Sequence, residues 1–322
     1  MDWYEPEEIW GIYGINSRED FVDRYVVEGK FQNDVPEDIV KSFVTVSYLL
    51  AHSYYHWPMF DEALRKSLLI MEMEIKLKAK ALDIELKLSP NKKGVVYDKK
   101  LWKLIEEICQ IKDLSFLQSD FDRARNIRNS RMHPDRYSFS GAMSFADVNA
   151  QLFVNVINML FMQKEQLVNL HNRTESLDEK LQPFRNGLLV LEFQSQKILI
   201  DGFYTFKYRE FKNNKLLLLY INPLTTKVNE QFVEKKYPEP LVITFVDFEI
   251  KSESIEGFDL KEQSMKIYID NKEQNLKTYY EYNIALSRIP ESDMHTFFQL
   301  NSSPALWKME KIIYENCWSN VF

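Results

Sequence analysis

Hydrophobic positions recur with the period of an α-helix through the first half of the chain. The clearest run begins at Pro58, where apolar residues return every three or four positions and neither Gly nor Pro interrupts until Pro90. One long helix is therefore predicted from Pro58 to about Leu88. The same periodicity predicts helices over residues 37–52, 101–111, 116–132 and 144–170, which together favour an antiparallel bundle.

Beyond Pro183 the pattern changes to short apolar, aromatic or alternating runs separated by turn-prone pieces. These runs predict strands over 187–193, 197–211, 215–222, 241–250, 264–270 and 276–286, followed by helices over 291–300 and 305–317. The predicted fold class is α+β. A helical domain (residues 1–180) is followed by a mostly antiparallel β domain with C-terminal helices (residues 185–322), and 171–184 is the expected linker.

Composition excludes several kinds of chemistry. The chain has eight glycines where average usage of about 7% would give about 23, and none stands in a dinucleotide-binding or P-loop spacing. Cys109 and Cys317 are isolated, and no histidine pair has a catalytic metal spacing, so neither a cofactor nor a metal is expected. His52 and His56 could bind a metal weakly, but their aromatic neighbours favour packing.

Targeting signals are not evident in the sequence. The first ten residues are acidic where a signal peptide needs a basic segment followed by an apolar run. The apolar stretch at 43–51 is far shorter than the roughly 20 residues that a membrane span requires. We therefore expect a cytoplasmic protein without a membrane partner.

Charge is distributed unevenly. With 41 basic and 48 acidic residues the net charge is −7, which disfavours a protein that holds duplex DNA by bulk neutralisation. The exception is residues 123–136, which contain five arginines against one acid, Asp135. These arginines are Arg123, Arg125, Arg128, Arg131 and Arg136.

This basic segment carries a candidate site for phosphate chemistry. On a helix, Arg125, Asn129 and His133 fall at i, i+4 and i+8, and Arg128 lies about 100° from Asn129. A guanidinium group can bind two oxygens of one phosphate at once, and an imidazole can transfer a proton near neutral pH. RNA supplies its own nucleophile in the 2′-hydroxyl, so such a site needs no metal.

Residues 128–133 resemble a known motif. Arg-Asn-Ser-Arg-Met-His matches the R-N-x-x-x-H form of the motif of the HEPN superfamily, and the flanking helices resemble its bundle over residues 37–170. The resemblance implies a metal-independent endoribonuclease of a bacterial defence or toxin system, with a composite site in a homodimer. It gives Arg128 the role of phosphate ligand, Asn129 that of orienting residue and His133 that of general acid or base. Arg125 and Arg131 match no required position and are expected only as supporting RNA contacts.

A second interpretation is a helical bundle of the same kind without catalytic activity. The arginines would then form ion pairs with acids such as Glu72, Glu74, Asp120 or Asp122, and the protein would be a non-catalytic dimerisation or interaction module. In either case the C-terminal domain is expected to sense a trigger or bind a regulatory protein or ligand. The expected dimer surface is the apolar stripe of 145–160 with exposed faces of the helix containing Leu64 and Leu86. Aromatic runs at 203–208 and 279–282 could stack bases, although packing is the favoured interpretation.

Overall fold

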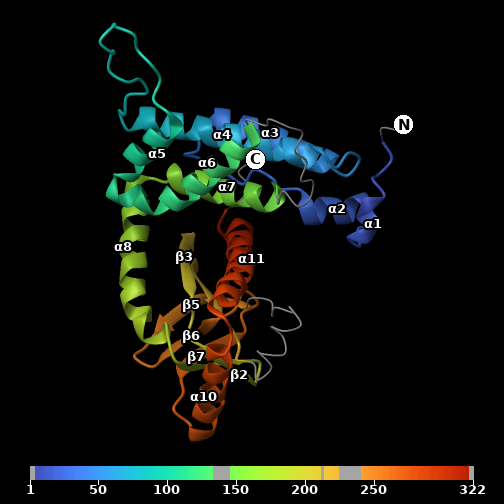
Figure 1. The fold of residues 1–322 in the computed structure, drawn as a ribbon, viewed down its shortest axis with the longest axis vertical. Helices are drawn as coiled ribbons and strands as arrows, with labels where there is room; N and C mark the ends of the chain where they lie inside the picture. Colours follow the sequence, from blue (N-terminus) through green and yellow to red (C-terminus); the bar gives the residue numbers. More distant parts are fainter. Residues whose placement is uncertain (1–3, 133–145, 212–213, 225–240, 319–322) are drawn as a thin grey trace. The chain divides into compact units, whose positions relative to one another are not determined.

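The computed structural model describes residues 4–132, 146–211, 214–224 and 241–318 (Figure 1). The described chain forms two compact units. The first contains the residues up to Val168 together with Trp318, and the second contains Asn169–Cys317. The fold is mixed α+β, with helices at both ends of the sequence and an antiparallel sheet between them, which confirms the predicted class at this level.

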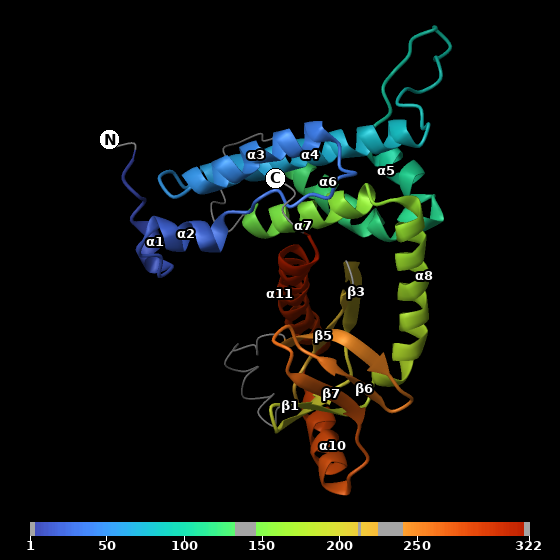
Figure 2. The ribbon, with the colours of Figure 1, turned by 180° about the vertical axis from the view of Figure 1, so that it is seen from behind.

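The first unit is helical. Its amphipathic helices pack through their apolar faces: α3 lies along α4, and α4 in turn packs against α7, α6 and α5 (Figure 2). The prediction over 37–52 is confirmed with the same bounds. The elements are α1 (Ile9–Ile12), α2 (Arg18–Tyr25), α3 (Glu37–His52), α4 (Met59–Ala81), α5 (Leu101–Cys109), a short 3₁₀ segment η1 (Lys112–Leu117), α6 (Gln118–Met132) and α7 (Ala146–Leu160).

The predicted continuation of α4 to Leu88 is wrong. The helix ends at Ala81, and Asp83 has a φ of +56°, which turns the chain out of the helix. From Leu82 to Leu88 apolar and polar residues alternate, which is the period of a strand. This segment folds back on 95–99 as a hairpin: the Leu88 N–H donates to the Tyr97 carbonyl (2.8 Å) and the Lys99 N–H to the Leu86 carbonyl (2.8 Å). We call residues 86–99 the arm; it projects beyond the end of α4 (Figures 1 and 2).

A single helix over 144–170 is also not what forms. Helix α7 ends at Leu160, α8 (Lys164–Leu181) follows after a short break, and the expected linker 171–184 is helical throughout, ending in η3 (Gln182–Phe184). The break coincides with a change in burial, because every residue of 149–160 is buried whereas Lys164 and Glu165 are exposed. The predicted start at Ser144 lies outside the described residues.

Buried amides on α7 hold other segments of the first unit. The Asn158 side chain donates to the Lys30 carbonyl (2.8 Å), and its Oδ1 accepts the Gln32 backbone N–H (2.8 Å). One turn earlier, the Asn155 Oδ1 accepts the indole N–H of Trp318 (2.7 Å). Asn155 and Trp318 are both buried, so the last described residue of the chain is part of the interior of the first unit.

The second unit is built on a seven-stranded antiparallel sheet of order β2-β1-β7-β6-β5-β4-β3. Apolar side chains at alternate positions form its core on one face, where Leu181 and Phe184 from the end of α8 and from η3 cover them. The strands are β1 (Leu188–Phe193), β2 (Gln196–Asp201), β3 (Thr205–Phe211), β4 (Asn214–Ile221), β5 (Leu241–Ile250), β6 (Ser254–Phe258) and β7 (Ser264–Ile269). Strand β6 was missed in the sequence.

Two helices lie against the opposite face of this sheet. Helix α10 (Glu273–Ser287) contacts β1, and α11 (Glu291–Cys317) contacts β3, β4 and β5, with an ion pair between Glu310 and Lys207 of β3. The predicted strand 276–286 is therefore wrong: its tyrosines also fit a helical period, and Tyr279 donates a hydrogen bond to Asp201 (2.9 Å). The two predicted C-terminal helices are one, which continues through Pro304.

Gly202 fixes the turn between β2 and β3. It has a φ of +54°, and an added Cβ would lie 2.2 Å from the carbonyl oxygen of Arg185. Its N–H donates to the Gly187 carbonyl (2.9 Å). Both the backbone conformation and the close approach require glycine here.

Candidate functional site

Helix α6 carries the predicted site residues toward a cleft of about 700 Å³ in the first unit. Phe121 and Ala124 are buried and fix the helix, which leaves Arg125, Arg128 and Asn129 to line the cleft. The remaining lining comes from α4, from the base of the arm and from α5. These residues are Glu72, Lys76, Leu86, Asp98, Lys99, Lys100, Leu101, Trp102 and Leu104.

The cleft is basic although the whole chain is acidic. Five of its lining residues are lysines or arginines and only two, Glu72 and Asp98, are acids. Lys76 and Arg128 share Glu72, and Lys99 pairs with Glu107 of α5 (2.6 Å). Lys100 is exposed at its edge. Positive charge therefore exceeds negative charge around the cleft, which favours an anionic ligand.

Arg128 is held by an ion pair from the neighbouring helix. Its Nη2 lies 2.8 Å from Oε2 of Glu72, whose other oxygen accepts a hydrogen bond from Lys76 (2.8 Å). The two side chains of the Arg128–Glu72 pair are 23% and 21% exposed. Burial alone would raise the pKa of Glu72, but Lys76 and Arg128 outweigh it and the net pKa is lowered. Arg128 is thus neither open to solvent nor withdrawn from the cleft: it is a half-buried cation whose counter-ion is another lining residue.

The other two described site residues are more accessible. Asn129 is exposed, and its Oδ1 lies 3.5 Å from Nη1 of Arg128. Arg125 pairs with Asp122 one turn earlier on the same helix (3.3 Å), and the two side chains are 30% and 36% exposed. The ion pairs that the non-catalytic interpretation expects with Glu72 and Asp122 are therefore present. His133 lies outside the described residues, as does the side chain of Arg131.

Glu74 lies two residues from Glu72 and points into the core. It has no exposed surface, and neither carboxylate oxygen has a hydrogen-bond partner among the described residues. Burial raises the pKa of this carboxyl well above its usual value, so it is held as the neutral acid. It forms none of the ion pairs with arginine that the sequence allowed, as far as the described residues show.

The expected dimer surface is wrong in its main part. Helix α7 packs against α4, and Leu152, Val156, Met159 and Leu160 are all buried, so its apolar stripe is a core face. Phe145 lies outside the described residues. The helix contains polar amides at buried positions because they hold the adjoining segments by hydrogen bonds.

Some of the remaining sequence candidates take part in packing, whereas His56 and Tyr280 are exposed. The His52 ring lies tilted against that of Tyr48 (4.6 Å between ring centroids), whereas His56 faces Glu7 with 3.7 Å between Nδ1 and Oε1. Within the described ranges, no three His, Cys, Asp or Glu side chains are grouped to hold a metal ion. Phe203 and Tyr208 are buried in the second unit, as is Tyr282, so packing accounts for them.

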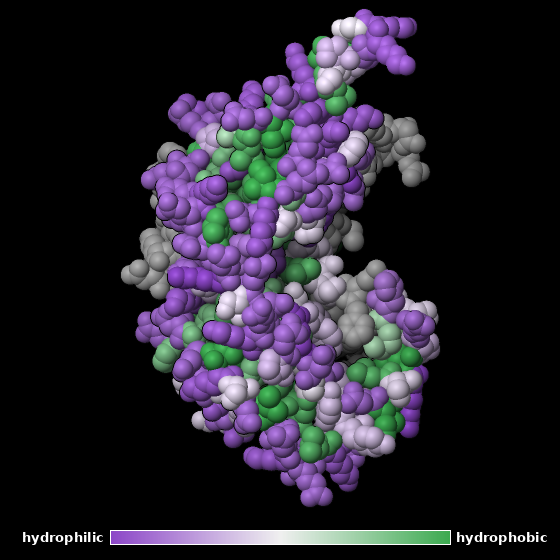
Figure 3. Space-filling model, turned by 90° about the vertical axis from the view of Figure 1, so that its left-hand side faces the viewer, coloured by the Kyte–Doolittle hydropathy of each residue, from purple (hydrophilic) through white to green (hydrophobic). Residues whose placement is uncertain are grey.

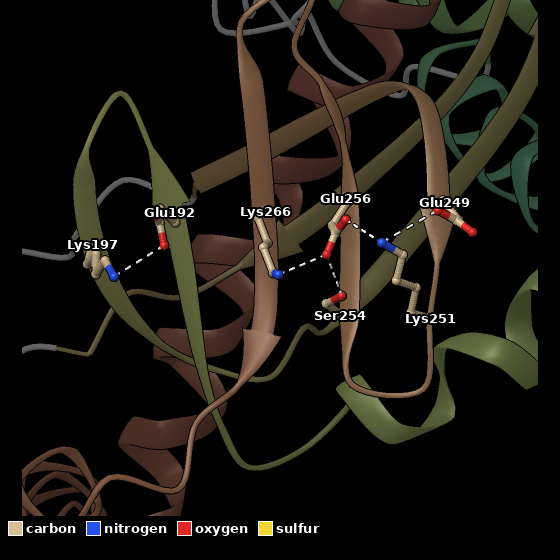
Figure 4. Close-up of polar contacts among 7 residues, drawn as sticks. All are labelled: Glu192, Lys197, Glu249, Lys251, Ser254, Glu256 and Lys266. Carbon is tan, nitrogen blue, oxygen red and sulfur yellow. Dashed lines mark hydrogen bonds and ion pairs between the residues drawn. The ribbon is translucent and has the colours of Figure 1, made fainter.

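The second unit has a hollow of its own that sequence reasoning missed. About 950 Å³ lies over the ends of β1, β5, β6 and β7, where a row of charges crosses the sheet (Figure 4). Lys197 pairs with Glu192 (3.3 Å) and Lys266 with Glu256 (2.8 Å), and Lys251 lies between Glu256 (2.6 Å) and Glu249 (3.6 Å). Hydrogen bonds from Lys251, Lys266 and Ser254 lower the pKa of Glu256 to about 2. Each charge of this row, which we call the charge ladder, has a partner of opposite sign, so the ladder supports the pairing of the neighbouring strands.

No family model matches the chain, and no match is found among curated proteins or solved structures. In the described part of the chain, no helix combines the length and apolar content needed to cross a bilayer.

Proposed function

We propose that the first unit binds RNA in the cleft beside α6 and cleaves it without a metal ion. The observation that carries this proposal is the convergence of Arg125, Arg128 and Asn129 with three lysines on one cleft of a protein whose net charge is −7. The R-N-x-x-x-H sequence at 128–133, similar to that of HEPN ribonucleases, supports the choice of RNA and of cleavage over simple anion binding.

The chemistry follows from the side chains. A phosphodiester entering the cleft offers Arg128 an acceptor that competes with Glu72, and a guanidinium can hold two of its oxygens. Asn129 keeps the guanidinium oriented through Oδ1. His133 acts as general base or acid while the 2′-hydroxyl attacks the adjacent phosphorus, and the products are a 2′,3′-cyclic phosphate and a 5′-hydroxyl.

We further propose that two copies of the chain combine their α6 ends in one site. One motif supplies a single imidazole, whereas in-line displacement uses a group on the attacking oxygen and another on the leaving oxygen. A two-fold dimer supplies both through an isologous interface. Mixing His133→Ala with Arg128→Ala chains should then restore part of the activity in heterodimers, and a strict monomer that cleaves RNA would refute this arrangement.

The deciding experiment is digestion of total RNA in EDTA by the wild-type protein and by His133→Ala, followed by end-group analysis. We expect cyclic-phosphate ends from the wild type and a rate lower by roughly 10²–10⁴ for the variant, with little change in thermal stability. Tyr280→Ala, which removes an exposed side chain of the second unit, is the control and should cleave at the wild-type rate. Loss of cleavage in EDTA, or full activity of His133→Ala, would contradict the mechanism.

A second candidate function is favoured by the Arg128–Glu72 ion pair itself. If the pair is permanent, the first unit is an interaction module without catalysis, and the second unit binds a regulatory protein or ligand. Glu72→Gln separates the two. For an RNA-binding cleft, removing the competing carboxylate should raise RNA affinity about threefold to tenfold, whereas an interaction module should lose stability and gain no affinity.

A further inference from the structure

The arm and its flanks form the most basic stretch of the first unit outside α6. Residues 75–100 contain eight lysines and three acids, a net charge of +5 in a chain whose total is −7. Lys87, Lys92 and Lys93 are exposed on the arm. The base of the arm, through Leu86, Asp98 and Lys99, is part of the cleft lining, so the arm continues directly from the cleft.

Local hydrogen bonds hold the arm in a defined shape. Asn91 Oδ1 accepts the backbone N–H groups of Lys93 (2.9 Å) and Val95 (3.0 Å), and Gly94 has a φ of +74° that closes the turn. The Asn91 N–H in turn donates to the Val95 carbonyl (2.9 Å). The lysines at the tip are therefore presented on an ordered turn, which lowers the entropy lost when they bind.

Aromatic side chains are open along the same surface. Tyr97 on the arm is 57% exposed, and Trp102, which lines the cleft, is 46% exposed. Figure 3 shows the arm at the top of the view, with hydrophilic residues at its tip and more hydrophobic ones below. Exposed rings beside lysines are a pattern of single-strand binding, because unpaired bases stack on rings while the lysines contact phosphates; the bases of a duplex are already stacked.

We propose that Tyr97, Trp102 and the lysines of the arm form a binding surface for single-stranded RNA that leaves the cleft. That the strand is RNA rests on the proposed function. Trp102 holds a base at the edge of the cleft, Tyr97 holds another on the arm, and Lys92 and Lys93 contact phosphates at the tip. The charge of the arm favours this occupant over a protein segment, which the exposed apolar residues alone would also fit.

The test measures binding apart from cleavage. In a His133→Ala background with EDTA, the anisotropy of a fluorescent 12-nucleotide unstructured RNA is followed at several salt concentrations. Tyr97→Ala and Trp102→Ala should each weaken binding about 5- to 100-fold, and Trp102→Phe should restore most of the loss. Lys92→Gln/Lys93→Gln should weaken binding and lower the slope of log affinity against log salt by about 1.4, because two phosphate contacts are lost.

Matched controls come from the exposed surface of α10. Tyr280→Ala removes a tyrosine that is 66% exposed, and Lys272→Gln/Lys277→Gln, at the start of α10 and in its second turn, removes the same charge; both should bind within about twofold of the parent. The proposal is overturned if the arm variants bind RNA as tightly as the parent, or if the parent does not bind RNA. The first of these results would favour a protein as the partner of the arm. An equal effect of Tyr97→Ala on duplex RNA overturns it as well. If RNA binding depends on the arm but the wild-type protein does not cleave RNA, the proposed nuclease activity is refuted and the proposed binding surface is supported.

Discussion

Replacing Glu74 by Gln should stabilise the protein at neutral pH. The side chain is fully buried without a hydrogen-bond partner among the described residues, and burial raises its pKa well above the ordinary 4.5. At pH values above 4.5 the Glu74 carboxyl loses its proton in the unfolded chain, whereas it keeps the proton in the folded protein. The free energy of unfolding therefore falls by about 1.4 kcal/mol for each pH unit over which this difference persists.

Gln carries no such proton, so its advantage should grow with pH. Between pH 4.5 and pH 7 the Glu74→Gln variant should gain about 1–3 kcal/mol over the wild type, whereas at pH 4 the two proteins should be nearly equal. Urea unfolding followed by tryptophan fluorescence suits the measurement, because most described tryptophans lie in the first unit: Trp10, Trp57, Trp102 and Trp318, against Trp307 in the second.

A control on the same helix is Glu62→Gln. Glu62 is 53% exposed and pairs with Arg65 at 2.5 Å, so its loss should change the free energy of unfolding by less than about 0.5 kcal/mol. A Glu74→Gln variant that is less stable than the wild type at pH 7 would refute the reasoning. So would a difference that does not change between pH 4 and pH 7, because the buried proton would then play no part.

Three further perturbations test other parts of the fold. Gly202→Ala should cost at least about 2 kcal/mol in urea unfolding, because φ is positive and the new Cβ meets a carbonyl, whereas Gly11→Ala, with no atom within 4 Å, should cost much less. Trp318→Phe should cost about 1–3 kcal/mol because it removes the buried hydrogen bond from the indole N–H to Asn155; adding Asn155→Leu should recover part of that loss, and simple additivity would argue against the hydrogen bond. Glu256, with a pKa lowered to about 2, contributes stability above pH 4.5 that is lost as the pH falls toward 2; Glu256→Gln should flatten this decline in the urea midpoint, and an unchanged decline would assign it to other acids.

Elements with a single periodicity could be predicted from the sequence. Helix α3 matches its predicted bounds because its buried residues, Ile39, Phe43, Val46 and Leu50, recur every three or four positions. The strand prediction over 276–286 is wrong because a run of tyrosines suits either a strand or a helix. The hydrogen bond from Tyr279 to Asp201, 78 residues away in the sequence, has no local signal. Residues 82–88 alternate as a strand does, but they follow a strong helix without Gly or Pro, so the prediction continued the helix through them.

The candidate site was predictable only in part. The arginines and Asn129 on α6 could be named from their spacing, and Glu72 was among the acids considered as partners. The lysines of the cleft were not predicted, because Lys99 and Lys100 join Arg128 in the cleft lining only through the hairpin, whose first strand the sequence prediction assigned to the preceding helix. The charge ladder was hidden for a similar reason: β6 was not recognised, and with it the register that places Glu256 between two lysines.

The position of Trp318 has a consequence for synthesis of the chain. The first unit is interrupted in the sequence by the 149 residues from Asn169 to Cys317, and Trp318 completes its interior. At 5–20 residues per second a ribosome needs roughly 7–30 s to make that insertion. Until then the hydrogen bond from the Trp318 indole to Asn155 cannot form, and the core of the first unit lacks the Trp318 side chain. A chain released early would lack this closure, so the first unit reaches its full stability only after the second has been translated.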